Sequence, residues 1–222
     1  MESNYTYAAI VIAAGLSSRM GKFKPLLEVG GKPALFRLLD TIEAAGIKRT
    51  FVVTGHDHKK IDKALAGSKY RLSTIYNTDY KTGMFSSIQA GIRRVAIGDA
   101  VLLFPVDVPL VGVDTIAGLT GAWERSMLLR KFAPGSDRNV IANAAKHPPF
   151  CLPVYEEKNG HPLLIPREYF QDILTYQGDD GLKGFRAAFD ADIIKYQAPD
   201  AGCVLDMDTP EDYAAILSHA AI

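Results

Sequence analysis

The segment AAGLSSRMGKFK, residues 13–24, combines glycine, hydroxyl and cationic residues in a pattern suited to binding phosphate. Its two glycines allow tight turns and close backbone approach, so several N–H groups can converge on an anion. Hydroxyl donors and three cations lie close together along it: Ser17, Ser18, Arg19, Lys22 and Lys24. Such a loop could hold a triphosphate and offset charge at a reacting phosphorus atom. A basic surface loop without a ligand is the alternative, but the position directly after an apolar run favours phosphate binding.

Two better-known phosphate-binding loops do not match this segment. The P-loop of ATPases has four residues between its first glycine and a Gly-Lys pair, which Ser or Thr follows. Here five residues separate Gly15 from Gly21, and Phe23 follows Lys22. The dinucleotide-binding pattern G-x-G-x-x-G also fails, because Ser17 stands where its second glycine should be. A P-loop kinase or GTPase is therefore disfavoured.

Three acidic residues are candidates to bind a metal ion. Asp107 follows the apolar segment AVLLF and lies between Pro105 and Pro109, which stiffen its loop. Asp206 and Asp208 are separated by one residue, so an extended segment would place both on the same side. A few hard oxygen ligands, completed by phosphate and water, suit Mg²⁺. From these residues alone, Asp107 could equally be an acid in a surface loop.

The residues after Asp208 predict the start of a helix. Thr209 is a typical N-cap, Pro210 suits the first helical position, and Asp212 would be the acid of a capping box. This pattern explains the TPED segment and leaves Asp206 and Asp208 without a structural role.

Strand-like and helix-like segments alternate from residue 7 to about residue 130. Continuous apolar or β-branched runs predict strands at residues 7–14, 50–54, 72–76 and 100–104. Apolar residues at helical spacing predict helices between Pro33 and Gly46, over 57–66, and from Phe85 to Val95. The alternation predicts an α/β fold whose mainly parallel central sheet carries helices on both faces.

In such a sheet, ligands bind beyond the carboxyl ends of the strands. Three segments should therefore meet at one rim: the loop after Ala14, Thr54–Asp57 and Pro105–Pro109.

Beyond Arg130 the pattern is less regular. The segment KFAPGSDR predicts an exposed loop over 131–138. Strands are expected at 140–143, 152–155 and 163–165, and helices at 167–174 and 182–189. We interpret residues 1–222 as a single domain, in which 1–130 form a nucleotide-binding half and 131–222 an acceptor-side half.

The composition excludes several classes of partner. Lys+Arg and Asp+Glu both number 25, so no positive excess favours nucleic acid or an anionic membrane. No run approaches the length of a membrane span, and the short apolar run near the N-terminus lacks the basic flank of a secretory signal. Cys151 and Cys203 form neither a metal-type pair nor a disulfide framework and are expected to be buried thiols. A cytoplasmic location is therefore expected.

Residues 13–27, AAGLSSRMGKFKPLL, resemble the signature loop of the nucleotidyltransferases that activate sugars, isoprenoid precursors and molybdenum cofactor. Later segments resemble the molybdenum cofactor cytidylyltransferase branch, in the family's order: NTDYKTGMFSSIQAG (77–91), PVDVP (105–109), NGHPLLIPREYF (159–170), GDDGLKGF (178–185) and DMDTPEDY (206–213). Together these segments cover nearly the whole chain. The resemblance implies a Rossmann-like nucleotidyltransferase fold, an NTP donor and Mg²⁺ as cofactor. It also implies transfer of an NMP unit to a pterin phosphate with release of pyrophosphate.

The resemblance also assigns roles to residues. It implies that Lys24, Arg19 and Asp107 are catalytic. It also implies that Asp107 binds the metal together with one of Asp206 and Asp208, of which we prefer Asp208. The residues expected to bind the nucleotide are Ala13, Ala14, Gly15, Ser17, Ser18, Arg19, Met20, Gly21, Lys24, Thr54, Gly55, Asn77, Gly83 and Ser87. The residues expected on the acceptor side are Gly160, His161, Pro162 and Asp180. Ser86 and Ser87 could equally be residues that start a helix.

Several alternatives stay open at this point. The Ala13-Ala14-Gly15 form, in place of Ala-Gly-Gly, resembles enzymes of the family that use CTP more than those that use GTP. The acceptor could also be a sugar phosphate or another small phosphate, and a non-catalytic carrier that delivers cofactor to a molybdoenzyme is a third hypothesis. The cationic loop and three candidate metal acids favour catalysis, because a carrier would not need the metal.

Overall fold

The computed structural model describes residues 5–132, 147–188 and 192–220. Its centre is an eight-stranded sheet with the order β10-β7-β9-β6-β1-β4-β5 and with β8 paired to β7. The strands are β1 (Tyr7–Ala13), β4 (Thr50–Thr54), β5 (Leu72–Tyr76), β6 (Ala100–Pro105), β7 (Phe150–Tyr155), β8 (Lys158–Asn159), β9 (Leu163–Pro166) and β10 (Ile193–Gln197). A separate hairpin contains β2 (Glu28–Val29) and β3 (Lys32–Pro33).

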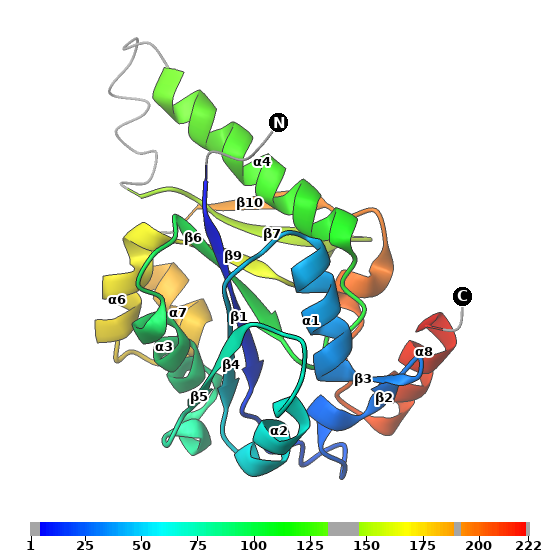
Figure 1. Ribbon diagram of the computed structural model, residues 1–222. Helices are drawn as coiled ribbons and strands as arrows, with labels where there is room; N and C mark the ends of the chain where they lie inside the picture. Colours follow the sequence, from blue (N-terminus) through cyan, green and yellow to red (C-terminus); the bar gives the residue numbers. More distant parts are fainter. Residues whose placement is uncertain (1–4, 133–146, 189–191, 221–222) are drawn as a thin grey trace.

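Helices cover both faces of the sheet (Figure 1). They are α1 (Ala34–Ala44), α2 (His58–Leu65), α3 (Met84–Arg94), α4 (Val113–Phe132), α6 (Phe170–Thr175), α7 (Gly181–Ala188) and α8 (Pro210–Ala220). Short 3₁₀ turns lie at η1 (Lys24–Leu26), η2 (Tyr80–Thr82), η3 (Arg167–Tyr169) and η4 (Ala201–Val204). None of the helices in the described ranges combines the length and apolar character needed to cross a membrane.

The central strand β1 contributes to a hydrophobic core on each face. Because successive side chains of a strand point to opposite faces, Ala9 and Val11 pack with α1 and α4. Ile10 and Ile12 pack with α3, α6 and α7 on the other face. This burial on both faces explains why the segment is a continuous apolar run rather than an alternating one.

Most of the elements predicted in the first half are confirmed. β4 and β5 have the predicted bounds, and α1 buries Leu35, Leu38 and Ile42. Pro33, however, belongs to β3 and is the N-cap of α1 rather than its first residue.

The second half agrees in outline and differs in detail. The expected helix over 167–174 is divided into η3 and α6, and β10 was not expected. Lys131 and Phe132 end α4 instead of starting a loop. The rest of that loop, the strand expected over 140–143 and Phe189 lie outside the described residues.

Strands from both halves of the chain join the central sheet. β9 runs antiparallel to β6 and to β7, whereas β10 is parallel to β7. The sheet is therefore mainly parallel, as predicted, with β9 and the short β8 reversed.

Candidate active site

The three segments predicted to share one rim do lie together. The carboxyl end of β1 is held beside the segment after β4, because the backbone N–H of His56 donates to the Ala14 carbonyl (3.3 Å). On the other side, Val106 N–H donates to the Ile12 carbonyl (3.1 Å). Parallel strand order thus places the glycine loop between the segments that follow β4 and β6.

The glycine loop folds back on itself. Ser17 and Gly21 both have positive φ values, of 53° and 63°. Gly21 N–H donates to the Ser17 carbonyl (3.1 Å), and Lys24 N–H donates to Ser17 Oγ (3.2 Å). These contacts fix the start of η1 and orient the Lys24 side chain.

Lys24 lies among the candidate metal acids. Its Nζ is 2.6 Å from Asp208 Oδ1 and 3.5 Å from Asp107 Oδ2. Arg19 Nη2 lies 2.8 Å from the other Asp208 oxygen. The hydrogen bond from Lys24 is the main reason that the pKa of Asp208 is lowered. Two cations and two carboxylates from three distant segments therefore form one ion-pair cluster.

The C-terminal helix brings Asp208 to this cluster. The capping box is confirmed, since Thr209 Oγ1 donates to Asp212 Oδ2 (2.8 Å) and Asp212 N–H donates to Thr209 Oγ1 (3.2 Å). Met207 is fully buried with Val29 and Ile216, where α8 packs on the β2–β3 hairpin. Figure 1 shows α8 beside this hairpin.

Asp206 and Asp208 flank buried Met207, and Met207 N–H donates to the Asp107 carbonyl (2.9 Å). Partial desolvation and the negative charges of Asp208 and Asp107 raise the pKa of Asp206. Asp206 is solvent-exposed and makes no ion pair with the described cations, whereas Asp208 joins Lys24 and Arg19.

The residues fit a small divalent cation. The Lys24 ammonium group already occupies a position between two carboxylates, where positive charge is favoured. Within the described ranges, no group of three or more His, Cys, Asp or Glu residues could hold a metal ion. A cation here would therefore take carboxylate oxygens from Asp107 and Asp208 and complete its shell with phosphate and water, as Mg²⁺ does.

A cavity of about 340 Å³ opens at this rim. Of the residues predicted to bind nucleotide or metal, those that line it are Ala13, Ala14, Gly15, Ser17, Ser18, Arg19, Lys24, Gly83, Ser87, Asp107 and Asp208. Those that do not line it are Met20, Gly21, Thr54, Gly55, Asn77 and Asp206. The sequence prediction missed Tyr80 and Lys81, which line the cavity from η2.

Two of the residues outside the lining support the cavity wall. Asn77 Nδ2 donates to Ser86 Oγ (2.9 Å) and Ser87 Oγ (3.0 Å), which orders the start of α3. A Cβ added at Gly55 would lie 2.6 Å from the Tyr80 Cβ, so only glycine permits this approach. Direct contact between Asn77 and a base stays a prediction.

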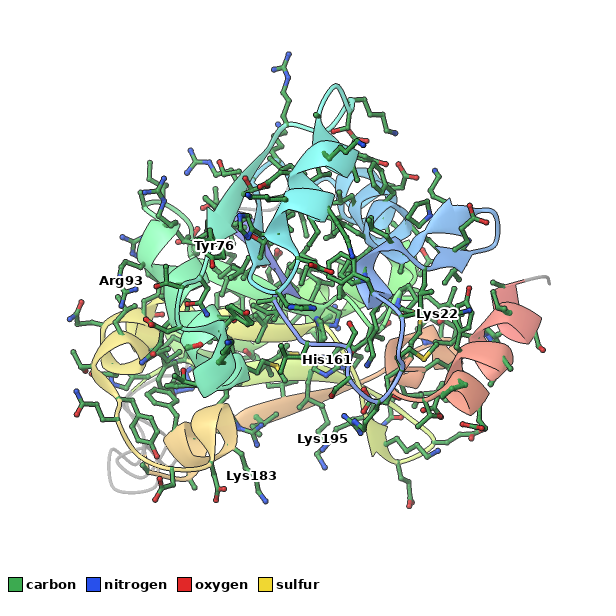
Figure 2. All side chains as sticks on the ribbon, turned by 90° about the horizontal axis from the view of Figure 1, so that it is seen from below. Lys22, Tyr76, Arg93, His161, Lys183 and Lys195 are labelled. Carbon is green, nitrogen blue, oxygen red and sulfur yellow. The ribbon has the colours of Figure 1, made fainter. Side chains whose placement is uncertain are left out.

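A second, larger cavity of about 730 Å³ adjoins the first and shares Gly83 and Met84 with it. Three of the predicted acceptor-side residues line it, namely Gly160, His161 and Asp180, whereas Pro162 does not. Figure 2 labels His161 near the middle of the molecule, seen from below.

His161 is held by its backbone, whose N–H donates to the Cys203 carbonyl (2.8 Å). Its Nδ1 is buried and has no hydrogen-bond partner in the described residues. Burial lowers the pKa of His161, and the negative charge of Asp107 opposes that shift. The larger cavity is therefore lined by an imidazole whose pKa is lowered and whose Nδ1 has no partner among the described residues.

The two cysteines are buried, as expected. Desolvation raises the pKa of Cys151 to about 12 and that of Cys203 to about 11. Neither thiol is a nucleophile at neutral pH.

Comparison with known proteins agrees with this geometry. The family model of the MobA-like NTP transferase domain matches residues 9–193. The molybdenum cofactor cytidylyltransferase of Escherichia coli (strain K12) is 26% identical over 209 residues, which cover 92% of each chain.

Two solved structures share the fold. A nucleotidyl transferase from Methanothermobacter has a TM-score of 0.72 and 22% identity, with 99% of each chain covered. A Mycobacterium tuberculosis H37Rv protein, solved in complex with manganese, has a TM-score of 0.64 and 20% identity. That superposition covers 96% of this chain and 98% of the other.

The fold, the residues at the rim of the sheet and the similar proteins together identify this chain as an enzyme of the nucleotidyltransferase class. Within that class, the chain belongs to the family of MobA-like NTP transferase domains.

Proposed function

We propose that this nucleotidyltransferase transfers CMP from CTP to a molybdenum-cofactor-type pterin phosphate, depends on Mg²⁺ and releases pyrophosphate. The observation that carries the proposal is the ion-pair cluster of Lys24, Asp107 and Asp208. This cluster lines the smaller cavity, which adjoins the larger one, so two substrates could bind side by side. CTP as donor is supported by the cytidylyltransferase relative from E. coli. The manganese bound by the Mycobacterium tuberculosis relative supports a divalent cation.

The reaction needs a phosphate oxygen of the acceptor to attack the α-phosphorus while the bond to the β-phosphate oxygen breaks. A phosphate nucleophile is anionic at neutral pH, so no general base is required. The backbone of Gly15–Ser18 binds the β- and γ-phosphates, and Lys24 and Arg19 stabilise charge that develops at the α-phosphate. Asp107 and Asp208 would hold the Mg²⁺ ion, which supplies charge neutralisation of the triphosphate when bound. Binding of the nucleotide and the acceptor in two adjoining cavities brings the attacking oxygen close to the α-phosphorus, which accelerates the reaction by proximity.

The test is a screen of the purified protein for Mg²⁺-dependent release of pyrophosphate. Each NTP is combined with a pterin phosphate, a sugar phosphate and other small phosphates. Release with CTP and the pterin phosphate supports the proposal, and release with a sugar phosphate would reassign the acceptor. If the pterin phosphate binds tightly and no NTP is consumed, the protein is a carrier of that compound and the proposal fails.

A further inference from the structure

The acceptor cavity contains an arginine that neither the sequence motifs nor the proposed mechanism uses. Arg186 lies on α7 and lines the cavity together with Lys183, one turn earlier on the same helix. Lys183 on α7 and His161, in the segment between β8 and β9, both line this cavity. Figure 2 labels the two side chains, and that of Lys183 extends outward at the lower edge of the view.

The positive charge of Arg186 is not compensated by the described residues. Its Nε is buried without a hydrogen-bond partner, and none of the described acids forms an ion pair with the guanidinium group. Desolvation is the cause that lowers the pKa of Arg186. A desolvated charge without a partner costs stability, and proteins keep such groups mainly at functional sites.

The position of α7 is fixed by close packing at its N-terminal turn. A Cβ at Gly184 would lie 2.0 Å from the Asp179 carbonyl oxygen, and one at Gly178 would lie 2.4 Å from the Tyr176 hydroxyl. Gly184 N–H donates to the Asp180 carbonyl (3.2 Å). Phe185, the residue before Arg186, is fully buried against the rings of Tyr169 and Tyr176, so the helix presents Arg186 from a fixed support, as a recognition residue requires.

Arg186 lies away from the place where the two cavities meet. Gly181, at the start of α7, approaches Phe85, which adjoins the shared residue Met84. Arg186 is five residues further along the helix, about 7.5 Å at the usual helical rise. An acceptor whose phosphate reaches the first cavity would thus extend its other end toward Arg186.

We propose that Arg186, assisted by Lys183, binds an anionic group of the acceptor other than the phosphate that attacks the nucleotide. The inference rests on the proposed function, because it takes the larger cavity as the acceptor site. A second anionic group of the acceptor supplies the missing negative charge, and the planar guanidinium matches two oxygen atoms of an anion, as phosphate and carboxylate present them, with two parallel hydrogen bonds. Asp179 and Asp180 line the same cavity and would repel an anion near the N-terminal turn of α7, which favours binding at the Arg186 end.

The first experiment needs no turnover. The ¹⁵N–¹H signal of Arg186 Nε is assigned with Arg186→Lys and followed while inorganic phosphate or acetate is titrated into the protein. A saturable shift with phosphate alone would indicate that Arg186 binds a phosphate group, and a shift with acetate alone would indicate a carboxylate. A shift with both anions would indicate that Arg186 binds anions in general. No saturable shift with either anion overturns the proposal, whatever the outcome of the pyrophosphate screen.

The second experiment separates recognition from a structural role. Methionine has a similar volume and no charge, so Arg186→Met should leave the melting temperature unchanged or raise it, while phosphate binding at α7 is lost. Arg93→Met, which removes an exposed arginine of α3 outside both cavities, is the matched control. A large fall in melting temperature for Arg186→Met alone would show that the arginine is structural and would overturn the proposal.

Steady-state kinetics give a third readout with any acceptor that the screen identifies. Arg186→Met should raise the KM for the acceptor at least about tenfold, with the KM for the nucleotide unchanged. Arg186→Lys should restore part of the loss. An unchanged acceptor KM would remove Arg186 from acceptor recognition, even if transfer itself is efficient.

Discussion

The two cavities that we propose for the nucleotide and the acceptor differ in how the charges of their lining residues are compensated within the described part of the chain. At the rim, Lys24 and Arg19 are paired with Asp107 and Asp208. In the acceptor cavity, Arg186 and His161 Nδ1 lack partners among the described residues.

This difference means that the net binding free energy of the two ligands should arise in different ways. A triphosphate and its cation must exchange existing ion pairs for new ones, so the net gain from each contact is limited by the pair that is broken. An acceptor that brings an anion to Arg186 instead satisfies a group already desolvated. We therefore expect the rim residues to affect turnover and the α7 residues to affect acceptor binding.

The largest effect should follow loss of a rim carboxylate. Asp107→Asn and Asp208→Asn each remove a proposed cation ligand and one of the two carboxylates that pair with Lys24, so kcat/KM should fall by about 10²- to 10³-fold. Pyrophosphate release measured over a range of Mg²⁺ concentrations tests this, with Asp114→Asn on the exposed first turn of α4 as control. A severe loss in Asp206→Asn, with Asp208→Asn nearly normal, would reverse the order that we assign to this pair.

Loss of Lys24 should come next. Lys24→Ala removes the buried cation proposed to act on charge in the transition state, so kcat should fall by about 10²-fold while the fold survives. Single-turnover kinetics and circular dichroism measure the two outcomes. Lys22→Ala changes an exposed lysine of the same loop, outside the cavity lining, and should lower kcat much less. Near-normal turnover in Lys24→Ala would exclude this residue from the mechanism.

The choice of base should have a smaller effect. Ala14 lies at the cavity wall, and we expect its methyl group to restrict the space for a base beside the strand ends. We expect CTP to be preferred over GTP by at least about tenfold, or about 1.4 kcal/mol. The measurement is kcat/KM for both nucleotides with one acceptor. Equal values, or a preference for GTP, would reject cytidylyl transfer and leave the nucleotidyltransferase class intact.

The smallest effect should be that of Arg19 on stability. The Arg19 side chain is 70% exposed, and Lys24 would still pair with Asp208 in its absence. Arg19→Gln should therefore change the free energy of unfolding by about 0.5 kcal/mol or less, as measured by urea denaturation. A loss of several times this size would mean that the rim cluster holds the fold together rather than serving the ligand.

Local patterns predicted the first half of the fold well. Strand β4 and the buried face of α1 follow from apolar spacing alone, because burial leaves a direct mark on the sequence, whereas β5, which has no buried residue, was predicted from its β-branched and aromatic residues. Strand β9 was also predicted, over 163–165, but its antiparallel direction was not, and the edge strand β10 was not predicted at all. Their places depend on which neighbours they pair with, and β10, with Lys195 and Gln197 exposed, is a weak apolar signal.

For the site, the sequence determined which residues have the required chemistry: the glycine loop, Asp107 and the Asp206–Asp208 segment. Only the tertiary structure decided that Lys24 pairs with Asp208, 184 residues away. It also decided that Asn77, which lies outside the lining of the first cavity, donates to Ser86 and Ser87, and that Arg186 has no counter-charge among the described residues. Composition and spacing act locally along the chain, whereas charge compensation depends on distance and burial in three dimensions. That is why the motifs could indicate the cations of the rim, whereas only the fold could show that Arg186, which lies in none of the motifs, has no counter-charge among the described residues.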